Sequence, residues 1–584
     1  MKWFFVLSVY FLMRTSGVQA QDSLSLIRLD QEGFYPYAPK VAIVTGPVKT
    51  IHFFVIRKNN PDTVFRGLMA SSRHSLNSSL VTRVADFSAL TRPGIYQLIV
   101  PGYAHSCPFR ITPQVHHRLA LAALKAFYFQ RASLTLEPAY AGKWSRKSGH
   151  PDDSVWIHPS AASANRQSGS LISTPGGWYD AGDYNKYVVN SGISTSTLLS
   201  AYEDFSIYFD TLRTHIPPLD KQIPDILNET LYNLRWMFTM QDPGDGGVYH
   251  KCTNADFDAM VMPEMAHRPR YVVQKGTAAT LDLAAVAAQA ARIFASFKKQ
   301  LPGLSDSCLQ IAEKAWSWAE LNPDLVYDQN AMNRLYEPKI NTGTYGDKKF
   351  SDEWFWAASE LYMTTGKLKY KATLEKYINE PFGLPSWSET GLLGYYDLIR
   401  SRDRPDLQIE KDSIHNRLVR MANQYLQASQ ENVFLTVMGG RKTDFNWGSN
   451  SNAANQGILL VKVYFLTRNP IYLDAALGNL EYLCGRNATG YCFITGMGCF
   501  STMHPHHRPS VADGIPEPVP GLLAGGPNPG EQDHCHYDFH EPETAYADSD
   551  CAYASNEIAI NWNAPLVYLA NAMESLEDKI VDVK

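Results

Sequence analysis

The sequence predicts a small all-β domain, a sandwich of short strands, followed by a much larger all-α domain. From about residue 23 to residue 112, short β-branched and aromatic runs are separated by Pro, Gly and Asn. After Pro113 the apolar residues recur every three or four positions, which is the period of a helix. We therefore expect a sandwich over 21–112 and a helical domain over 113–584.

Three runs carry the β prediction: 41–44, 51–56 and 95–100. Breaks such as Asn59-Asn60-Pro61 separate them, which is typical of a small sandwich with tight turns. About ninety residues of this texture suit an immunoglobulin-like module.

The helical period begins at 115–129. The other helical stretches lie near 190–204, 224–240, 276–297, 306–320, 352–365, 411–428, 453–467, 470–484 and 563–576. The stretch 276–297 is apolar nearly all round, so we expect it to be buried on most faces. A toroid of helical hairpins, with outer helices covering inner ones, would bury it in this way. Further helices are expected in the less regular segments.

The first twenty residues are typical of a secretory signal. Lys2 precedes a short apolar run that ends at Arg14, and Val18-Gln19-Ala20 resembles a cleavage site. A spanning helix would need about 20 apolar residues, and we expect no later run to cross a membrane. The first cysteine is Cys107, so no lipid-anchor cysteine stands at the junction. The sequence thus predicts an exported protein.

The composition narrows the class of ligand. With 45% hydrophobic residues, 19% charged residues and a net charge of -5, the chain has the balance of an ordinary soluble globular protein. Nucleic acid would call for a basic stripe, and a phosphate-binding glycine loop of the Walker type is not present. A neutral ligand fits better.

Eight cysteines in 584 residues are sparse for a disulfide scaffold, and none forms a Cys-x-x-Cys pair that would suggest structural zinc. We expect mostly buried free thiols. Cys492 and Cys499 are the one close pair for which a bridge is considered.

The segment Gly176–Tyr187 has a composition suited to sugar chemistry. Asp180 and Asp183 stand three residues apart among aromatic side chains such as Trp178. Cleavage of a glycosidic bond needs one carboxyl group to activate water and another to protonate the leaving oxygen. Taken alone, however, Asp-Ala-Gly-Asp also suits any tight turn.

A second carboxyl group is available near the C-terminus. Glu557 is the one carboxylate in the segment that leads into the last helix, and Pro565 is expected in the first turn of that helix. The alternative is that Glu557 only stabilises the helix N-terminus electrostatically.

Three histidines, His504, His506 and His507, lie close to Arg508 in a loop that contains Pro505 and Pro509. Metal binding, ordinary loop packing and hydrogen bonding to sugar hydroxyls all remain open, although the spacing matches no helical zinc motif.

Tryptophans divide into two classes by their surroundings. Trp447 lies among Asn, Gly and Ser, which favours a stacking platform for a sugar ring. Trp354 and Trp356 open an apolar helix, which favours core packing.

Together these segments resemble glycoside hydrolase family nine, the inverting cellulases with an (α/α)6 barrel, in the subgroup with an N-terminal immunoglobulin-like domain. The resemblance spans nearly the whole chain after residue 20. It rests on Leu29–Pro36, where Asp30 replaces the usual Asn, on Gly177–Asp183, on Pro505–Arg508, and on Tyr546, Asp548, Tyr553, Glu557, Ala559 and Asn563.

The resemblance implies roles for particular residues. Asp183 would be the general base, with Asp180 holding the same water, and Glu557 would be the general acid, with Asp548 as a supporting carboxylate. The substrate-binding residues implied or suggested by aromatic character are His506, Arg508, Trp447, Trp562, Tyr553 and Trp178. A departure is Cys499-Phe500, where relatives often have a basic residue.

The implied reaction is inverting hydrolysis of β-1,4-glucosidic bonds, with the acid and base carboxyls about 6.5 to 9.5 Å apart. No organic cofactor is required; a structural calcium ion is common in relatives, but its ligands cannot be placed, and no zinc set matches. The lack of a carbohydrate-binding module after the barrel favours soluble β-glucan, including xyloglucan or mixed-linkage glucan, over crystalline cellulose. We expect an endo-acting monomer. Alternatives are an exo-acting glucosidase or glucosaminidase, a non-catalytic glycan-binding protein and a histidine-based metallohydrolase.

Overall fold

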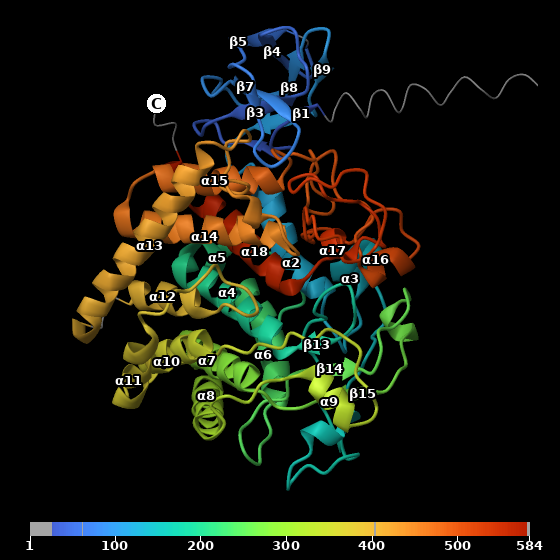
Figure 1. Cartoon of the computed structure of the whole chain (residues 1–584), viewed down its shortest axis with the longest axis vertical. Helices are drawn as coiled ribbons and strands as arrows, with labels where there is room; N and C mark the ends of the chain where they lie inside the picture. Colours follow the sequence, from blue (N-terminus) through green and yellow to red (C-terminus); the bar gives the residue numbers. More distant parts are fainter. Residues whose placement is uncertain (1–25, 61, 402–404, 581–584) are drawn as a thin grey trace, which may run out of the picture.

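The computed structural model describes residues 26–60, 62–401 and 405–580, and comprises a β-sheet domain followed by a helical one. The predicted signal segment lies outside these residues. The β domain sits at one end of the molecule, beside helix α15 (Ile471–Leu483) of the helical domain (Figure 1).

The β domain is an immunoglobulin-like pair of sheets. The first sheet has the order β1 (Ile27–Arg28), β3 (Val41–Thr45), β7 (Val81–Asp86) and β6 (Arg73–His74). The second has the order β2 (Gly33–Phe34), β10 (Phe109–Ile111), β8 (Gly94–Val100), β4 (His52–Arg57) and β5 (Thr63–Leu68), with β9 (Ala104–His105) paired to β8. The three predicted strands are therefore confirmed. Phe34 packs edge-on against Phe87 and Phe109 in the core.

The helical domain contains every helix that the sequence predicts. These are α2 (His117–Phe129), α4 (Val188–Asp204), α6 (Asp225–Thr239), α7 (Thr277–Phe294), α8 (Leu304–Leu321), α10 (Ser351–Thr365), α13 (Gln408–Ser429), α14 (Ser449–Thr467), α15 and α18 (Ile560–Ser575). The less regular segments contain two further long helices, α11 (Leu368–Tyr377) and α12 (Gly391–Arg400). Short helices are α3 (Pro138–Ala141), α5 (Ser206–Thr211), α9 (Gln329–Leu335), α16 (Arg508–Ala512) and α17 (Tyr553–Asn556).

Helix α7 is buried as predicted, packed against α4, α8 and α10. Trp354 and Trp356 of α10 lie in the same core, which confirms their predicted packing. No later run was expected to be long and apolar enough to cross a membrane, but one such run is present when length and composition alone are tested. The segment Thr277–Phe297 passes that test, yet 89% of its apolar window is buried inside the fold. Its apolar character is explained by packing on all sides.

A small sheet in the helical domain was not predicted. Its order is β12 (Leu171–Ile172), β11 (Val155–Ile157), β15 (Arg270–Val272), β14 (Lys251–Asn254) and β13 (Lys186–Tyr187). The strands are too short to produce a readable alternation of apolar and polar residues. Strand β13 directly follows the Asp180–Asp183 turn, so this sheet anchors one side of the site described below.

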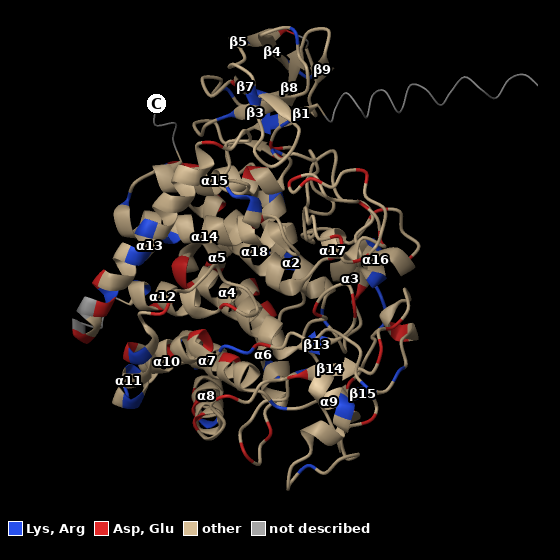
Figure 2. Ribbon diagram, viewed as in Figure 1, with Lys and Arg blue, Asp and Glu red and all other residues tan. Residues whose placement is uncertain are grey.

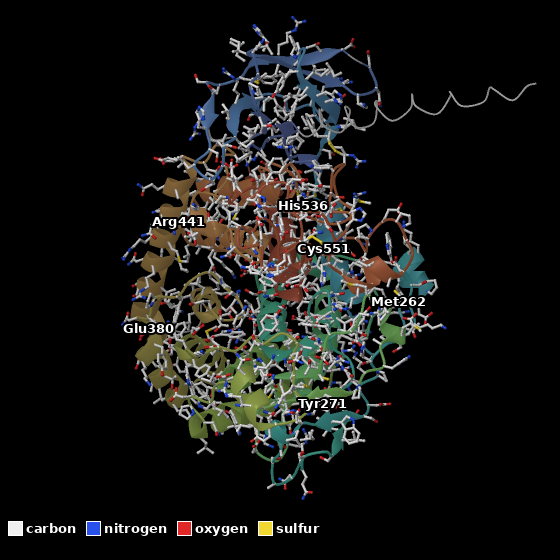
Figure 3. The ribbon with its side chains drawn as sticks, turned by 45° about the vertical axis from the view of Figure 1, so that its right-hand side comes forward. Met262, Tyr271, Glu380, Arg441, His536 and Cys551 are labelled. Atoms are coloured by element: carbon white, nitrogen blue, oxygen red, sulfur yellow. A yellow bond between two sulfur atoms is a disulfide. The ribbon has the colours of Figure 1, made fainter. Side chains whose placement is uncertain are left out.

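The cysteine prediction is wrong in its pairing. Cys499 bonds to Cys107 of the β domain, 392 residues away, and Cys535 bonds to Cys551, while Cys492 is a free, buried thiol. Figure 3 shows Cys551 and His536, the neighbour of Cys535, close together in the C-terminal loops. The expectation of buried free thiols holds for Cys252, Cys308, Cys484 and Cys492.

The two domains are joined by buried polar contacts as well as by the Cys107–Cys499 bridge. Asp30 lies 2.7 Å from Nε2 of His116, and both side chains are fully buried. The Tyr35 hydroxyl donates to Glu574 at 2.7 Å. Lys and Arg are interspersed with Asp and Glu over both domains (Figure 2).

Candidate active site

A cleft of about 920 Å³ brings together residues that are far apart in the sequence. The loops that precede α16 and α17 lie on the same side of the helical domain as β13–β15, away from α11–α13 (Figure 1). The predicted site residues that line the cleft are Asp180, Asp183, Trp447, His506, Arg508, Tyr553, Glu557 and Trp562.

On one side of the cleft, the turn that carries Asp180 and Asp183 is closed by Asn185. The Asp180 N–H donates to the Asn185 carbonyl at 3.0 Å, and the Asn185 side-chain amide donates to Asp183. The Asp180 carboxylate accepts from Asn190 Nδ2 at 2.8 and 3.0 Å and from the Tyr345 hydroxyl at 3.0 Å. Both carboxylates are therefore held by neutral donors.

The two carboxylates of this turn are electrostatically distinct. Burial raises the pKa of Asp183, while Arg508, the Asn185 amide and Arg270 act to lower it. Burial and the nearby Asp183 raise the pKa of Asp180 to about 8. Because donors and cations surround Asp183, it is the better-supported anion of the pair.

Glu557 lies across the cleft between α17 and α18. The last helix begins at Ile560, so Pro565 lies inside it rather than in the first turn, and Glu557 precedes the helix. Its backbone pairs with His506, and its carbonyl accepts from Gly525 N–H at 2.8 Å. Burial, Asp183 and Asp180 raise the pKa of Glu557 well above its usual range. Because two carboxylates act on Glu557 and cations act on Asp183, a proton is better placed on Glu557 than on Asp183.

Gly182 joins the two sides of the cleft. Its carbonyl accepts from the Arg508 N–H at 3.1 Å and from Arg508 Nη1 at 2.9 Å. A Cβ at Gly182 would lie 2.0 Å from the His506 carbonyl oxygen, so only glycine allows this approach. A second link is the backbone bridge between Ala181 and Ala559.

The histidines of the 504–507 loop have different environments. His506 Nδ1 donates to the Asp550 carbonyl at 2.6 Å, since a carbonyl only accepts. Burial lowers the pKa of His506, so the neutral ring carries its proton on Nδ1 and has Nε2 as an acceptor in the cleft. His507 is buried between Gln130 and Ser510. The described residues contain no group of three or more His, Cys, Asp or Glu arranged to hold a metal ion.

Aromatic side chains flank the carboxylates. Trp447 is 43% exposed and lies 5.7 Å from Tyr553, ring centre to ring centre. Trp562 is partly exposed. The cleft also contains Phe257, Tyr345 and Trp387, which the sequence reasoning missed because they come from irregular loops.

Two predicted site residues do not line the cleft. Trp178 is fully buried: its ring packs on Phe127, and its Nε1 donates to Glu229 at 2.8 Å. Its prediction as a substrate-binding residue is therefore wrong, because it belongs to the core beneath the base turn. Asp548 accepts from the N–H groups of Met503 and His504, so it supports the backbone of the histidine loop.

The chain is similar to known proteins along nearly all of its length. Residues 117–570 match the model for Glycosyl hydrolase family 9, and residues 22–105 match the Cellulase N-terminal ig-like domain. The xyloglucan-specific endo-beta-1,4-glucanase BoGH9A of Bacteroides ovatus is 44% identical over 554 residues, covering 94% of each chain. Endoglucanase D of Acetivibrio thermocellus is 32% identical, covering 93% of this chain and 82% of its own.

Solved structures give the same answer for the fold. The structure titled Bacteroides ovatus GH9 superposes with a TM-score of 0.90 at 43% identity, covering 94% of this chain and 99% of that one. A metagenome-derived family 9 endoglucanase superposes with a TM-score of 0.87 at 32% identity, covering 94% and 99%. With a family model matched over most of its length and relatives above 30% identity along nearly all of it, the chain belongs to glycosyl hydrolase family 9.

Proposed function

We propose that the protein is an endo-β-1,4-glucanase that hydrolyses soluble β-glucan by an inverting mechanism and that xyloglucan is its preferred substrate. One observation carries the proposal: Asp183 and Glu557 line a single cleft, where Arg508 and Arg270 act on Asp183 and the carboxylates of Asp183 and Asp180 act on Glu557. The relatives over nearly the whole chain include endoglucanases, one of which is named as xyloglucan-specific, as well as a cellobiosidase and a cellodextrinase.

In the proposed reaction, Asp183 takes a proton from water while the water oxygen bonds to the anomeric carbon. Glu557 gives its proton to the glycosidic oxygen as the bond between that oxygen and the anomeric carbon breaks. Asp183 ends protonated and Glu557 ionised, and solvent resets both. Because the water attacks the face opposite the leaving group, the product has inverted configuration, which requires the two carboxyls to lie about 6.5 to 9.5 Å apart.

The other cleft residues bind and orient. Asp180, held by Asn190 and Tyr345, helps to hold the same water. His506 and Arg508 bind sugar hydroxyls near the bond to be cleaved, and Trp447, Tyr553 and Trp562 offer flat apolar faces to pyranose rings. Asp548 supports the histidine loop without touching the substrate.

Further proposals go with this function. The helices form an (α/α)6 barrel, which agrees with the family 9 structures that superpose on the chain. The chain is exported and acts as a monomer, with the domain boundary near residues 111–113. Calcium stays a prediction: its fit is not supported by any cluster of three or more acidic, His or Cys side chains among the described residues, and no step of the reaction uses it.

The test is product analysis on xyloglucan, mixed-linkage β-glucan and carboxymethylcellulose. We expect a rapid fall in xyloglucan viscosity, oligosaccharide products and new reducing ends in the α configuration, detected by NMR immediately after cleavage. Release of monosaccharide alone would favour an exo-acting enzyme, and β-configured products would contradict inversion. Binding without hydrolysis of any of the three would favour a glycan-binding protein, and a chelator-sensitive active site would favour a metallohydrolase.

A further inference from the structure

Asn185 contacts the proposed general base directly. Its Nδ2 donates to Oδ2 of Asp183, and both residues are buried. Its backbone carbonyl accepts from Asp180 N–H at 3.0 Å. Asn185 therefore touches both carboxylate-bearing residues of the turn.

The orientation of the Asn185 amide is set by the neighbouring sheet. Its Oδ1 accepts from the Asn254 N–H at 2.9 Å and from Arg270 Nη1 at 3.4 Å, and the Thr253 hydroxyl lies 3.0 Å away. A flipped amide would place NH₂ against the fixed N–H donors of Asn254 and Arg270, which cannot accept. Only one orientation satisfies these groups, and it directs Nδ2 at Asp183.

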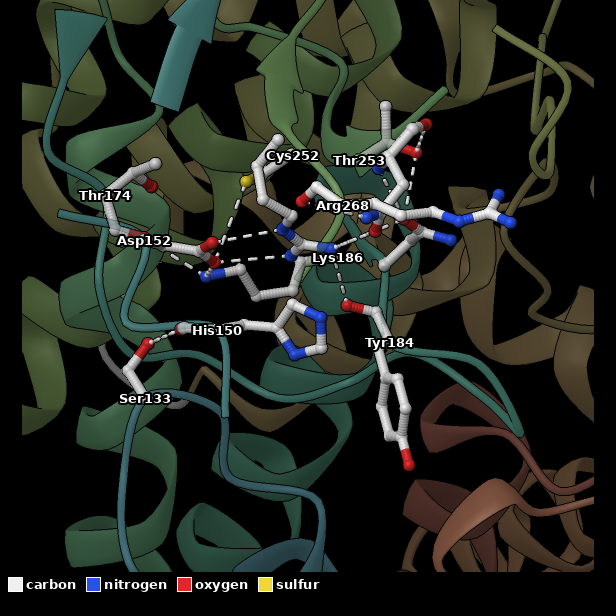
Figure 4. Close-up of polar contacts among 12 residues, drawn as sticks. Ser133, His150, Asp152, Thr174, Tyr184, Lys186, Cys252, Thr253 and Arg268 are labelled. Atoms are coloured by element: carbon white, nitrogen blue, oxygen red, sulfur yellow. Dashed lines mark hydrogen bonds and ion pairs between the residues drawn. The ribbon is translucent and has the colours of Figure 1, made fainter. Parts of the chain in front are cut away.

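Arg270 is itself fixed by a buried ion pair. Asp152 accepts from Arg270 Nε at 3.0 Å and from Nη2 at 3.2 Å, and it lies 2.7 Å from Lys186 Nζ. Arg270 Nη1 also donates to the Tyr184 carbonyl at 2.9 Å. Figure 4 shows Asp152 beside Lys186 and Cys252, with Tyr184 and Thr253 farther to the right.

We propose that Asn185 is a positioning residue for general base catalysis: oriented by Asn254 and Arg270, its amide keeps Asp183 ionised and fixes its carboxylate plane. The inference rests on the proposed role of Asp183 as the base. Burial alone would favour the protonated form of Asp183, which cannot accept a proton from water. The Asn185 amide opposes this effect, because it stabilises the charged form by donating a hydrogen bond.

Several other groups act on Asp183 at the same time. The titratable or charged side chains that face it or interact with it electrostatically are Asp180, Tyr187, Lys251, Arg270, Tyr345, His506, Arg508 and Glu557. Of these groups, Arg270 contacts the Asn185 side chain, through Oδ1, and Asn185→Asp keeps an oxygen at that position. A shift of the acid limb in both Asn185→Asp and Asn185→Ala therefore reports the loss of the amide donor, which is the change that the two variants share.

The experiment measures kcat and KM on xyloglucan oligosaccharide against pH for Asn185→Ala and Asn185→Asp. In Asn185→Asp one oxygen still accepts from Asn254 and Arg270, so the turn keeps its framework, while the other faces the Asp183 carboxylate. We expect the acid limb of the kcat/KM profile to move to higher pH by about one unit in Asn185→Asp, because two carboxylates then share one site. The move should be smaller in Asn185→Ala. In both variants kcat should fall about tenfold at the wild-type optimum with little change in KM.

The matched control is Asn228→Ala. Asn228 is also fully buried and accepts from two backbone N–H groups, those of Leu219 and Asp220, but it lies in α6 away from the cleft. We expect this variant to lower thermal stability without moving the acid limb. If both Asn185 variants also leave the limb in place, the inference is wrong. Asp183→Asn distinguishes failure of the base role of Asp183 from failure of the positioning role of Asn185. If Asp183→Asn retains activity, the base role itself is wrong.

Discussion

The two candidate catalytic carboxyl groups have different surroundings. The Asn185 amide donates to Asp183; burial raises the pKa of Asp183, and Arg508, this amide and Arg270 oppose that rise. The backbone of Glu557 pairs with His506 and Gly525, and burial, Asp183 and Asp180 raise the pKa of Glu557 well above its usual range, although Arg508 and the Gly182 backbone act to lower it.

This difference follows from the two chemical tasks. A base must stay ionised in a buried place, which requires donors and cations aimed at the carboxylate. An acid must keep its proton, which is favoured by burial beside other carboxylates. The base side accordingly rests on a buried ionic network, and the acid side rests on main-chain pairing between loops.

The largest expected effect comes from removing either carboxyl. Glu557→Gln and Asp183→Asn should each lower kcat by about 10² to 10⁴-fold on β-1,4-glucan, with binding retained. Steady-state kinetics and calorimetric binding of a cello-oligosaccharide would measure both effects. If one variant stayed close to wild-type turnover, the catalytic role assigned to the substituted residue would be wrong.

Asp152→Ala tests the ionic network beneath the base. It leaves Arg270 and Lys186 as buried cations without their carboxylate partner, so we expect a loss of about 3 to 5 kcal/mol in the free energy of unfolding. The contacts with Arg270 and Lys186 hold the pKa of Asp152 below its usual range. Its contribution is therefore complete above the unfolded-state pKa, near 3.9, and is lost as the pH falls toward the folded-state value.

Urea denaturation at pH 7 and at pH 3 would measure this. The difference between wild type and Asp152→Ala should be larger at pH 7. An equal difference at both pH values would show that the ionic interaction does not account for the loss.

Gly182→Ala tests the joint between the two sides. The new methyl group would lie 2.0 Å from the His506 carbonyl oxygen, so the loops must separate at a cost of about 1 to 3 kcal/mol. We expect a lower melting temperature together with a lower kcat, because the spacing of acid and base changes. Gly383→Ala, where the nearest atoms lie 3.7 Å away, serves as the control and should change neither value.

The smallest effect is expected at the edge of the cleft. Trp447→Ala removes an exposed ring that stacks beside Tyr553, and we expect KM for oligosaccharides to rise by a factor of about 3 to 10, corresponding to roughly 1 kcal/mol. Trp447→Phe should retain most of the affinity. An unchanged KM in the alanine variant would remove Trp447 from the proposed binding surface.

Much of the fold could be predicted because it is local. The helical period after Pro113, the strand texture before it and the burial of α7, Trp354 and Trp356 all follow from side-chain spacing. Asp180 and Asp183 are close because they share one turn. Their partner Glu557 was found as an isolated carboxylate before the last helix, and the structure brings it to the same cleft.

The order of the two domains, the main helices and the candidate carboxyl groups could be predicted from the sequence, because they depend on periodicity and on residue type. Tertiary structure alone decided that Trp178 is core, that Cys499 bonds to Cys107, and that Arg270 and Asn254 orient the Asn185 amide. These features depend on contacts between segments separated by tens to hundreds of residues. The chemical state of each carboxyl group depends on the same contacts, since burial and neighbouring charges are set only when the loops meet.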